Sequence, residues 1–302
     1  MRHHDVSLKI FSILVLSMFC WGSAYPVSKY IMCTVHPAFM AFTRHFMGFL
    51  PLIPFFFLER RKLGKPIVLK DMLMMSFIGT FGIAGFALFL FYGVDLSSAA
   101  TGPTLANTQP IFAVVLAPLI LKEPLHRWEI FGAVTGLFGM FLVTTGGNFT
   151  GLAVGGGYFM GNLLLLCAAI CMTMYNITLK GYIRTYGGMI PTFFTMLSGS
   201  LVLMAVSLGL NDWSVQLREF HGTLDVILVL YLGIIATALP FFLFNYVLKY
   251  MDVLRAAGFK FLIPVTGVAL SMLFIGEKPG VWTLIGIVIV VISVIILQRK
   301  PQ

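Results

Sequence analysis

One stretch of the chain occurs twice, and this duplication constrains the fold more than any other feature of the sequence. The first copy is Ala99–Glu123 and the second is Val253–Glu277, at an offset of 154 residues. The same offset relates several residues of distinctive type, namely Pro110 with Pro264, Tyr92 with Tyr246, Trp128 with Trp282, Gly132 with Gly286 and Glu123 with Glu277. Identities of this kind at one offset predict that the chain consists of two related halves.

The composition places both halves in a membrane. Apolar residues make up 59% of the 302 residues and charged residues 10%, and the mean hydropathy is +0.97. The apolar residues form blocks of about 20, the length that an α-helix needs to cross a bilayer. The blocks are apolar throughout, whereas the strands of a membrane β-barrel alternate between apolar and polar residues. The predicted transmembrane helices cover residues 10–31, 37–58, 72–93, 99–121, 128–146, 158–180, 189–210, 224–248, 254–275 and 281–298.

These ten helices divide evenly between the two halves. The Gly-rich and nearly uncharged connection Gly146–Gly157 separates a first repeat, residues 1–148, from a second, residues 149–302. We therefore predict an all-α integral membrane protein of ten transmembrane helices in two five-helix repeats. Because five is odd, the two repeats are inverted relative to each other. Inverted repeats are typical of secondary transporters that open alternately to either side of the membrane.

Lysine and arginine are distributed unevenly between the two sides that this topology defines. One side carries Arg218 and Lys278. The other side carries Arg2, Lys9, Arg60, Arg61, Lys62, Lys65, Lys70, Lys122, Arg127, Lys180, Arg184, Lys249, Arg299 and Lys300. Because basic connections stay in the cytoplasm, we expect both termini to be cytoplasmic and the protein to be multi-pass in a cytoplasmic or bacterial inner membrane. No soluble domain carries a basic stripe, so nucleic-acid binding is not expected.

Several local patterns occur together with this layout. The first helix contains Trp21-Gly22, the second contains Arg44 in an apolar context, and each half contains the Pro and Glu of the duplicated stretch. Over nearly the whole chain these patterns resemble the EamA-type members of the drug/metabolite transporter superfamily. The resemblance implies transport of amino acids, nucleotide sugars, sugar phosphates, choline or drugs. The second half departs from the pattern, since Met172-Thr173 stands where Trp21-Gly22 would align at an offset of 151.

Three cations lie within or at the ends of predicted helices: Lys29, Arg44 and Lys260. A cation at the centre of a membrane helix costs about 2.5–3.5 kcal/mol on insertion scales, so it normally faces a cavity or a partner. A long side chain can instead extend to the membrane interface. We expect Lys260 to face a central cavity and Lys29 to extend to the interface. For Arg44 the sequence leaves a cavity and a structural role open.

The acidic residues indicate the charge of the substrate. All eleven carboxylates lie at predicted helix ends or in connections, so none is placed to neutralise Lys260. A buried cation favours a ligand with a carboxylate or a phosphate. The hypothesis is an anionic or zwitterionic substrate, with amino acids as the leading candidates and export as the direction.

Further polar and aromatic residues are predicted to line the same crevice. Packing, hydrogen bonds between helices and an aromatic belt at the interface are the ordinary alternatives for such residues. Pro110 and Pro264 are candidate bends near the midplane because they are related by the offset. Glu123 and Glu277 are interpreted as structural. The predicted substrate-binding residues are Lys260, Asn107, Trp21, Tyr25, Asn176, Arg44, Thr104, Tyr92 and Tyr246.

Catalytic and cofactor-binding motifs do not occur in the sequence. It contains no HExxH, no GxSxG and no P-loop, so we expect no enzyme activity, no metal, no cofactor and no ATP-driven transport by this chain. The predicted function is secondary transport of a small molecule by alternating access. A passive facilitator or channel, and a transporter of phosphorylated or nucleotide-linked metabolites or of drugs, remain as alternatives. The sequence also leaves open whether a proton gradient drives transport and whether the protein is a monomer or a homodimer.

Overall fold

The chain is helical along nearly all of its described length. The computed structural model describes residues 3–31, 35–97, 102–122, 124–148, 158–210, 213, 222–274 and 278–298, and within these residues there is no strand. The helices are α1 (His3–Ile31), α2 (Pro37–Phe49), α3 (Leu52–Lys62), α4 (Leu69–Gly79), η1 (Thr80–Gly85), α5 (Phe86–Leu96), α6 (Gly102–Ala106), α7 (Gln109–Leu121), α8 (Arg127–Thr145), α9 (Phe159–Tyr186), α10 (Met189–Leu210), α12 (Thr223–Gly233), η3 (Ile234–Ala238), α13 (Leu239–Leu248), α14 (Val253–Gly258), η4 (Phe259–Phe261), α15 (Leu262–Phe274) and α16 (Val281–Leu297).

Many of these helices are long and apolar enough to cross a membrane. Helices α2 and α3 pass this test together across a 42° bend, and two shorter apolar helices cover Leu8–Ala24 and Val281–Leu297. The prediction of an all-α membrane-spanning protein is therefore confirmed for the part of the chain that the structure describes. Seven further stretches pass the test singly: Leu69–Leu96, Thr104–Leu121, Arg127–Thr145, Phe159–Tyr186, Met189–Leu210, Thr223–Leu248 and Val253–Leu270.

The bend between α2 and α3 differs from the single helix that the sequence predicts over 37–58. Helix α2 ends at Phe49, and α3 begins at Leu52 and continues to Lys62. Pro51 lies between them and has no N–H to continue the helical hydrogen bonds, which explains the bend. The helix extends past the apolar block because its last turn is basic, and cations are favourable at a helix C-terminus.

Two spans change helix type at positions that lie 154 residues apart. The π-helical segment η1 begins at Thr80 and the π-helical segment η3 begins at Ile234. A π-helical turn inserts an extra residue into the helix and leaves a backbone carbonyl without its usual partner. The offset seen in the sequence thus recurs in a local irregularity of the backbone.

Two further spans are interrupted at equivalent positions. Helix α6 ends before Asn107, and α7 resumes at Gln109 with Pro110 in its first turn, where a missing N–H is tolerated. The second interruption is the short 3₁₀ segment η4, which ends at Phe261 and is followed by α15 with Pro264 near its start. Asn107 and Phe261 are again 154 residues apart.

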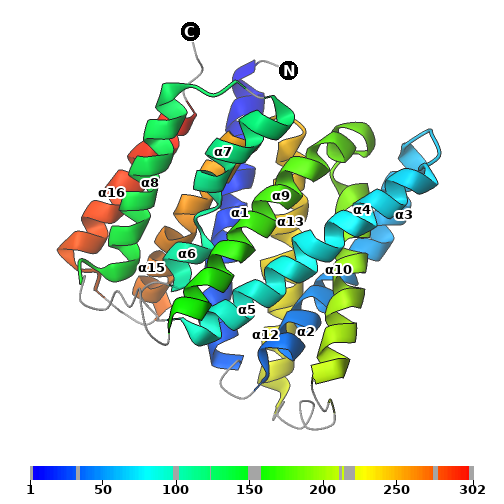
Figure 1. Cartoon of the computed structure of the whole chain (residues 1–302), viewed down its shortest axis with the longest axis horizontal. Coiled ribbons are helices and arrows are strands. Elements are labelled where there is room, and N and C mark those ends of the chain that lie inside the picture. Colours follow the sequence, from blue (N-terminus) through cyan, green and yellow to red (C-terminus); the bar gives the residue numbers. More distant parts are fainter. Residues whose placement is uncertain are drawn as a thin grey trace.

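The largest helix contacts join the first half of the chain to the second. Helix α8 packs along α16, α1 packs against α13 and α15, α5 against α9, and α2 against α10. In the α8–α16 pair a Cβ on Gly139 would lie 3.0 Å from the carbonyl oxygen of Gly286, and the Ser293 hydroxyl donates to the Gly132 carbonyl at 2.8 Å. Small residues permit this close approach in lipid. Figure 1 shows α8 and α16 side by side at one edge of the molecule, with the start of α1 and the end of α16 at the same end.

Candidate functional site

Lys260 lies in the interior of the protein, in the interruption η4. The residue is 1% exposed, and its Nζ donates a hydrogen bond to Oε1 of Gln109 at 2.5 Å. The same nitrogen lies 5.0 Å from the ring centre of Trp21 and 4.6 Å from that of Phe244. An amide oxygen and two aromatic rings therefore surround the ammonium group. Cation–π contacts of this kind stabilise a cation that has lost its water.

The interruption before α7 orients the Gln109 side chain. Gln109 is the first residue of α7, and Pro110 has no N–H to donate to the carbonyl of Ala106. Nε2 of Gln109 approaches that carbonyl at 3.5 Å. The amide nitrogen thus faces its own backbone while the amide oxygen faces Lys260. Pro110 thus accounts both for the break in the helix and for the direction of the Gln109 amide.

Helices α1 and α9 flank the two interruptions in related ways. The Thr173 hydroxyl of α9 donates to the Ala169 carbonyl at 2.8 Å and also lies 3.3 Å from the Gln109 carbonyl. Gly22 of α1 packs against the Ile263 carbonyl, which would lie 2.7 Å from a Cβ at position 22. The two carbonyls are related by the offset of 154, and positions 22 and 173 by the offset of 151. Where the second half departs from the Trp-Gly pattern, a contact of the Thr173 hydroxyl with the carbonyl takes the place of close glycine packing.

The next feature of the site is the charge of Lys260. Among the residues that the structure describes, no Asp or Glu forms an ion pair with Lys260. An ammonium group has three protons, and one of them is directed at Gln109. The group therefore retains donors for a carboxylate or a phosphate. The described residues contain no group of three or more side chains arranged to hold a metal ion.

A second buried polar cluster joins α9, α10 and α13. Nδ2 of Asn245 donates to the Tyr175 hydroxyl at 2.9 Å and to Oγ1 of Thr192 at 2.8 Å. This cluster adjoins the Lys260 group through Phe241, whose ring centre lies 5.5 Å from that of Trp21 and 6.1 Å from that of Tyr175. The two polar clusters thus share an aromatic wall.

Arg44 binds to the π-helical segment η3. Its Nε donates to Oγ1 of Thr237 at 2.7 Å, and its Nη2 donates to the carbonyl of Ala236 at 2.9 Å. The guanidinium carbon also lies 6.0 Å from the ring centre of Phe91. Because both acceptors belong to η3, Arg44 supplies donors where the π-helical turn disturbs the backbone bonding. This geometry favours the structural role that the sequence left open for Arg44.

Other predicted site residues are buried beside the interruptions. Thr104 of α6 hydrogen-bonds with Thr144 of α8, and Asn107 is 3% exposed at the break itself. Asn176 is buried on α9, one turn after Thr173. Thr104 and Asn107 thus belong to the interrupted span that carries Gln109, and Asn176 belongs to α9, which packs against α6 and α7.

The two repeat-related tyrosines contact aromatic residues near helix ends. Tyr92 lies near the end of α5 with its ring centre 5.9 Å from that of His36. Tyr246 lies near the end of α13, 5.3 Å from the ring of Tyr250. The rings that contact Lys260 are those of Trp21 and Phe244 instead.

Some predicted residues lie outside the described part of the structure. They are Glu123 and Glu277, and the side chains of Tyr25 and Lys29.

Two residues of the Lys260 group, Gln109 and Phe244, are not among the predicted substrate-binding residues. Gln109 carried a signal, because an amide in an apolar helix has several bonding groups to satisfy. Phe244 carried none, since it is one of 29 phenylalanines in the chain. Its contact with Lys260 depends on how α13 packs in the folded protein.

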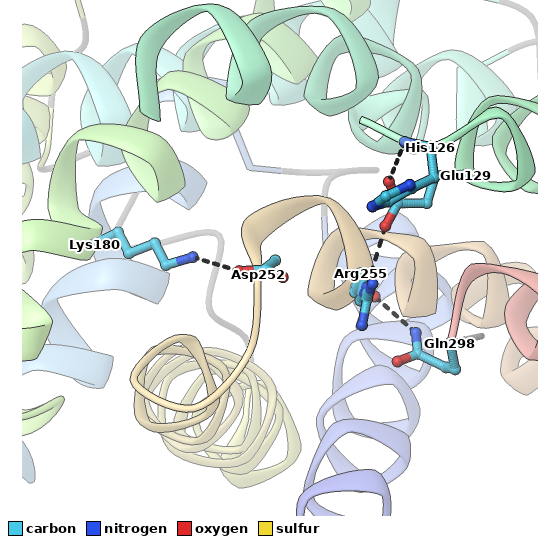
Figure 2. Close-up of polar contacts among 6 residues, drawn as sticks. All are labelled: His126, Glu129, Lys180, Asp252, Arg255 and Gln298. Carbon is cyan, nitrogen blue, oxygen red and sulfur yellow. Dashed lines mark hydrogen bonds and ion pairs between the residues drawn. The ribbon is translucent and has the colours of Figure 1, made fainter. Parts of the chain in front are cut away.

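Polar contacts hold the short helix α14 against its neighbours (Figure 2). Nζ of Lys180 lies 3.3 Å from Oδ1 of Asp252, and Nε of Arg255 donates to Oε1 of Glu129 at 3.1 Å. Nε2 of Gln298 donates to the Arg255 carbonyl at 3.1 Å. These contacts link α14 to α9, α8 and the end of α16. Because α14 leads directly into η4, they also position the segment that carries the central lysine.

Comparison with known proteins agrees with this fold. The model of the EamA-like transporter family matches residues 8–145 and again residues 159–299. The chain is 28% identical over 293 residues to the uncharacterized transporter YdfC of Bacillus subtilis, covering 96% of this chain and 90% of that one. It is 22% identical over 292 residues to a probable terminal-alkyne amino-acid exporter of Streptantibioticus cattleyicolor, covering 95% and 92%. A solved crystal structure has a similar fold, with a TM-score of 0.79 over 96% of each chain at 17% identity.

Proposed function

Because the chain belongs to the EamA-like transporter family, we propose that it is a secondary transporter that exports small anionic or zwitterionic metabolites, amino acids foremost. The observation that carries this proposal is the buried ammonium group of Lys260, held by Gln109 and two aromatic rings between two interrupted spans. Interrupted helices near the midplane are where secondary transporters bind their substrates.

We propose an architecture of ten transmembrane helices in two inverted repeats, residues 1–148 and 149–302. The two separate matches to the family model support it. So do the paired irregularities, η1 with η3 and the break before α7 with η4. The packing of α1 against α13 has its counterpart in the packing of α9 against α5, as an exchange of equivalent helices between halves requires.

In the proposed transport cycle, the two interrupted spans change the side to which the site opens. The ion pairs of Lys180 with Asp252 and of Arg255 with Glu129 hold α14 against its neighbours at one end. Breaking these pairs frees α14 to move about η4, which opens the site to that side while the opposite end closes. Hinge motion at a helix interruption is a common means of such gating.

The proposed substrate binds with its carboxylate at Lys260. The carboxylate accepts from the donors of Nζ that are not directed at Gln109, and an ion pair in a dry site is much stronger than the same pair in water. The rings of Trp21 and Phe244 then pack against the apolar part of the substrate. A relative whose name describes an amino-acid exporter supports the choice of amino acids.

The proposed location is a cytoplasmic or bacterial inner membrane with both termini in the cytoplasm. The start of α1 and the end of α16 lie at the same end of the molecule, which supports this orientation (Figure 1). The proposed partners are the substrate and the lipid bilayer, with a proton gradient as the energy source. The proposed unit is a monomer or a homodimer.

The test is exchange of labelled amino acids in proteoliposomes. We expect saturable counterflow with the wild type and at least a tenfold lower rate with Lys260→Met, because the substitution keeps the apolar stem and removes the cation. Lys249→Met is the matched control. Lys249 is exposed directly after α13, so the exchange rate of the Lys249→Met variant should stay within about twofold of the wild-type rate. Equal exchange by wild type and Lys260→Met would rule out Lys260 as the binding group.

The same vesicles separate the alternative functions. Flux that does not saturate and shows no counterflow would favour a passive facilitator or channel. Absence of amino-acid flux with a folded wild type would favour phosphorylated or nucleotide-linked metabolites, or drugs, as substrates. Flux that responds to an imposed pH gradient would identify protons as the coupling ion.

A further inference from the structure

The buried amide of Asn245 has an oxygen for which the described part of the chain supplies no hydrogen-bond donor. Asn245 is 0% exposed, and its Oδ1 has no partner while its Nδ2 donates twice. Buried polar atoms almost always have a partner, so an exception in a native structure calls for an explanation. A bound molecule that carries a donor is one such explanation.

The hydrogen-bond network determines which way the amide points. The hydroxyls of Thr192 and Thr195 donate to backbone carbonyls one turn earlier, at 2.6 and 2.9 Å. Each hydroxyl has a single proton, so Thr192 accepts from Asn245, and Thr195 accepts from Tyr175 at 3.3 Å. Tyr175 then accepts from Asn245 as well. The amide nitrogen must therefore face the network, and Oδ1 points away from it.

The free oxygen belongs to the helix that forms the aromatic wall of the Lys260 group. Phe244, the neighbouring residue on α13, contacts Nζ of Lys260. Phe241, one turn earlier on the same helix, contacts the rings of Trp21 and Tyr175. The Lys260 group and Asn245 are therefore connected through Trp21, Phe241 and Tyr175, whose hydroxyl accepts from Asn245.

We propose that Oδ1 of Asn245 accepts a hydrogen bond from the ammonium or hydroxyl group of the substrate while Lys260 binds its carboxylate. This inference rests on the proposed function and narrows its substrate class to amino acids and hydroxy acids. A neutral acceptor beside a buried cation suits a zwitterion, because it binds the donor without adding charge. A site built to bond an N–H or O–H of its substrate strongly rejects the analogue that lacks it, because the buried acceptor is then left unpaired.

A ligand series on the purified wild type tests the proposal directly. Labelled L-leucine is displaced by unlabelled L-leucine, by 2-hydroxy-4-methylpentanoate, which keeps a donor, and by 4-methylpentanoate, which has none. We expect 4-methylpentanoate to bind at least about tenfold more weakly than both donor-bearing ligands. The series is repeated with labelled L-glutamate, 2-hydroxyglutarate and glutarate. Equal binding within each series would overturn the proposal.

Variants connect this preference to Asn245. In Asn245→Leu the difference between leucine and 4-methylpentanoate should fall to within about twofold, because leucine loses its acceptor. Thr192→Val removes another member of the network and keeps Oδ1, so the preference should remain. Asn245→Asp also keeps an acceptor, so it should keep the preference. If the leucine variant does not fold, the ligand series on the wild type still tests the proposal.

The outcomes separate this inference from the proposed function. Lys260→Met should weaken all ligands of a series together and leave their ratio unchanged. Binding of leucine or glutamate with a ratio that Asn245→Leu does not alter would overturn the role of Asn245 and leave the amino-acid transporter intact. Failure of folded wild type to bind any ligand of either series would overturn the amino-acid assignment and this inference with it.

Discussion

The two interrupted spans have related backbones and different chemistry. Under the offset of 154, Lys260 of η4 corresponds to Ala106 of α6, and Gln109 of α7 corresponds to Ile263 of α15. Each span therefore supplies one member of the Lys260–Gln109 pair and has an apolar residue at the other position. The repeated sequence provides two breaks in the backbone, whereas one charged contact joins them. The difference teaches that an interruption can be duplicated as a scaffold while the polar residues on it diverge into a single site.

The largest expected effect tests how the flanking helices differ. A Cβ at Gly22 would lie 1.7 Å from Oγ1 of Thr266 and 2.7 Å from the Ile263 carbonyl. Gly22→Thr, which copies the residue at the equivalent position of α9, should cost about 3 kcal/mol of stability or more, since backbone atoms must shift. The reverse change, Thr173→Gly, removes a hydrogen bond and should cost about 1–2 kcal/mol. Thermal unfolding in detergent compares the two. Similar losses of stability in the two variants would show that Gly22 and Thr173 tolerate substitution equally well, contrary to their different surroundings.

The next effect tests the asymmetry of the central pair. Gln109→Leu leaves the Lys260 ammonium without its amide acceptor and should cost about 1.5–3 kcal/mol. The double variant Gln109→Leu/Lys260→Met should recover most of this loss, because the buried charge is gone. Ile263→Leu, at the position equivalent to Gln109, conserves volume and should cost less than about 1.5 kcal/mol. A double-mutant cycle of unfolding free energies measures the coupling, and strictly additive losses would contradict the contact.

A smaller effect concerns the two π-helical segments. Arg44→Lys replaces two directed donors on η3 by one ammonium group and should cost about 1–2 kcal/mol. The change should be local, so amide hydrogen exchange should rise in Ile234–Ala238 and stay unchanged in Thr80–Gly85. Equal changes in both segments would mean that Arg44 acts on the whole bundle and not on η3.

The smallest effect concerns the ion pairs at α14. The side chain of Asp252 is 47% exposed, whereas that of Glu129 is 6% exposed. The side chain of Lys180 is 3% exposed, but the amide oxygen of Asn still accepts from it, so Asp252→Asn should cost about 1 kcal/mol. The difference in stability between the wild type and Asp252→Asn should be smaller in about 1 M salt, which screens exposed charges. A loss of several kcal/mol in this variant would show that Asp252 has a partner of greater weight than Lys180.

The sequence predicts the class of fold well and the details of the helices poorly. Blocks of apolar residues predict helices in a membrane because a spanning backbone must satisfy its own hydrogen bonds, and the structure and the family match agree. The π-helical segments and the bend before Leu52 are harder to predict. They depend on how side chains such as Arg44 pack against neighbouring helices, and this packing is absent from a single apolar pattern.

Some residues of the candidate site can likewise be predicted from the sequence, and others cannot. Lys260 stands out in the sequence because a cation is costly in an apolar helix, and Gln109 could have been selected by the same argument. Phe244 and Asn245 could not, since an aromatic contact and an unpaired amide oxygen become evident only when α13 lies beside η4, α9 and α10. Tyr92 and Tyr246 share the offset, and their contacts are with other aromatic residues. Residues related by the offset thus indicate the backbone features that the two halves share better than they indicate which side chains form the candidate site.

The pairing of α8 with α16 has a consequence for biosynthesis. Among the helices that the structure describes, α16 leaves the ribosome after all the others, and α8 presents Gly132 and Gly139 to it. Helix α1 likewise packs against α13 and α15, which are synthesised much later. The glycine-lined surface of α8 therefore has no partner in the bilayer until α16 has been synthesised, so its folding depends on late contacts between residues distant in sequence. A nascent chain that stops before Val281 exposes that surface to other membrane proteins, and to the proteases that remove unassembled helices.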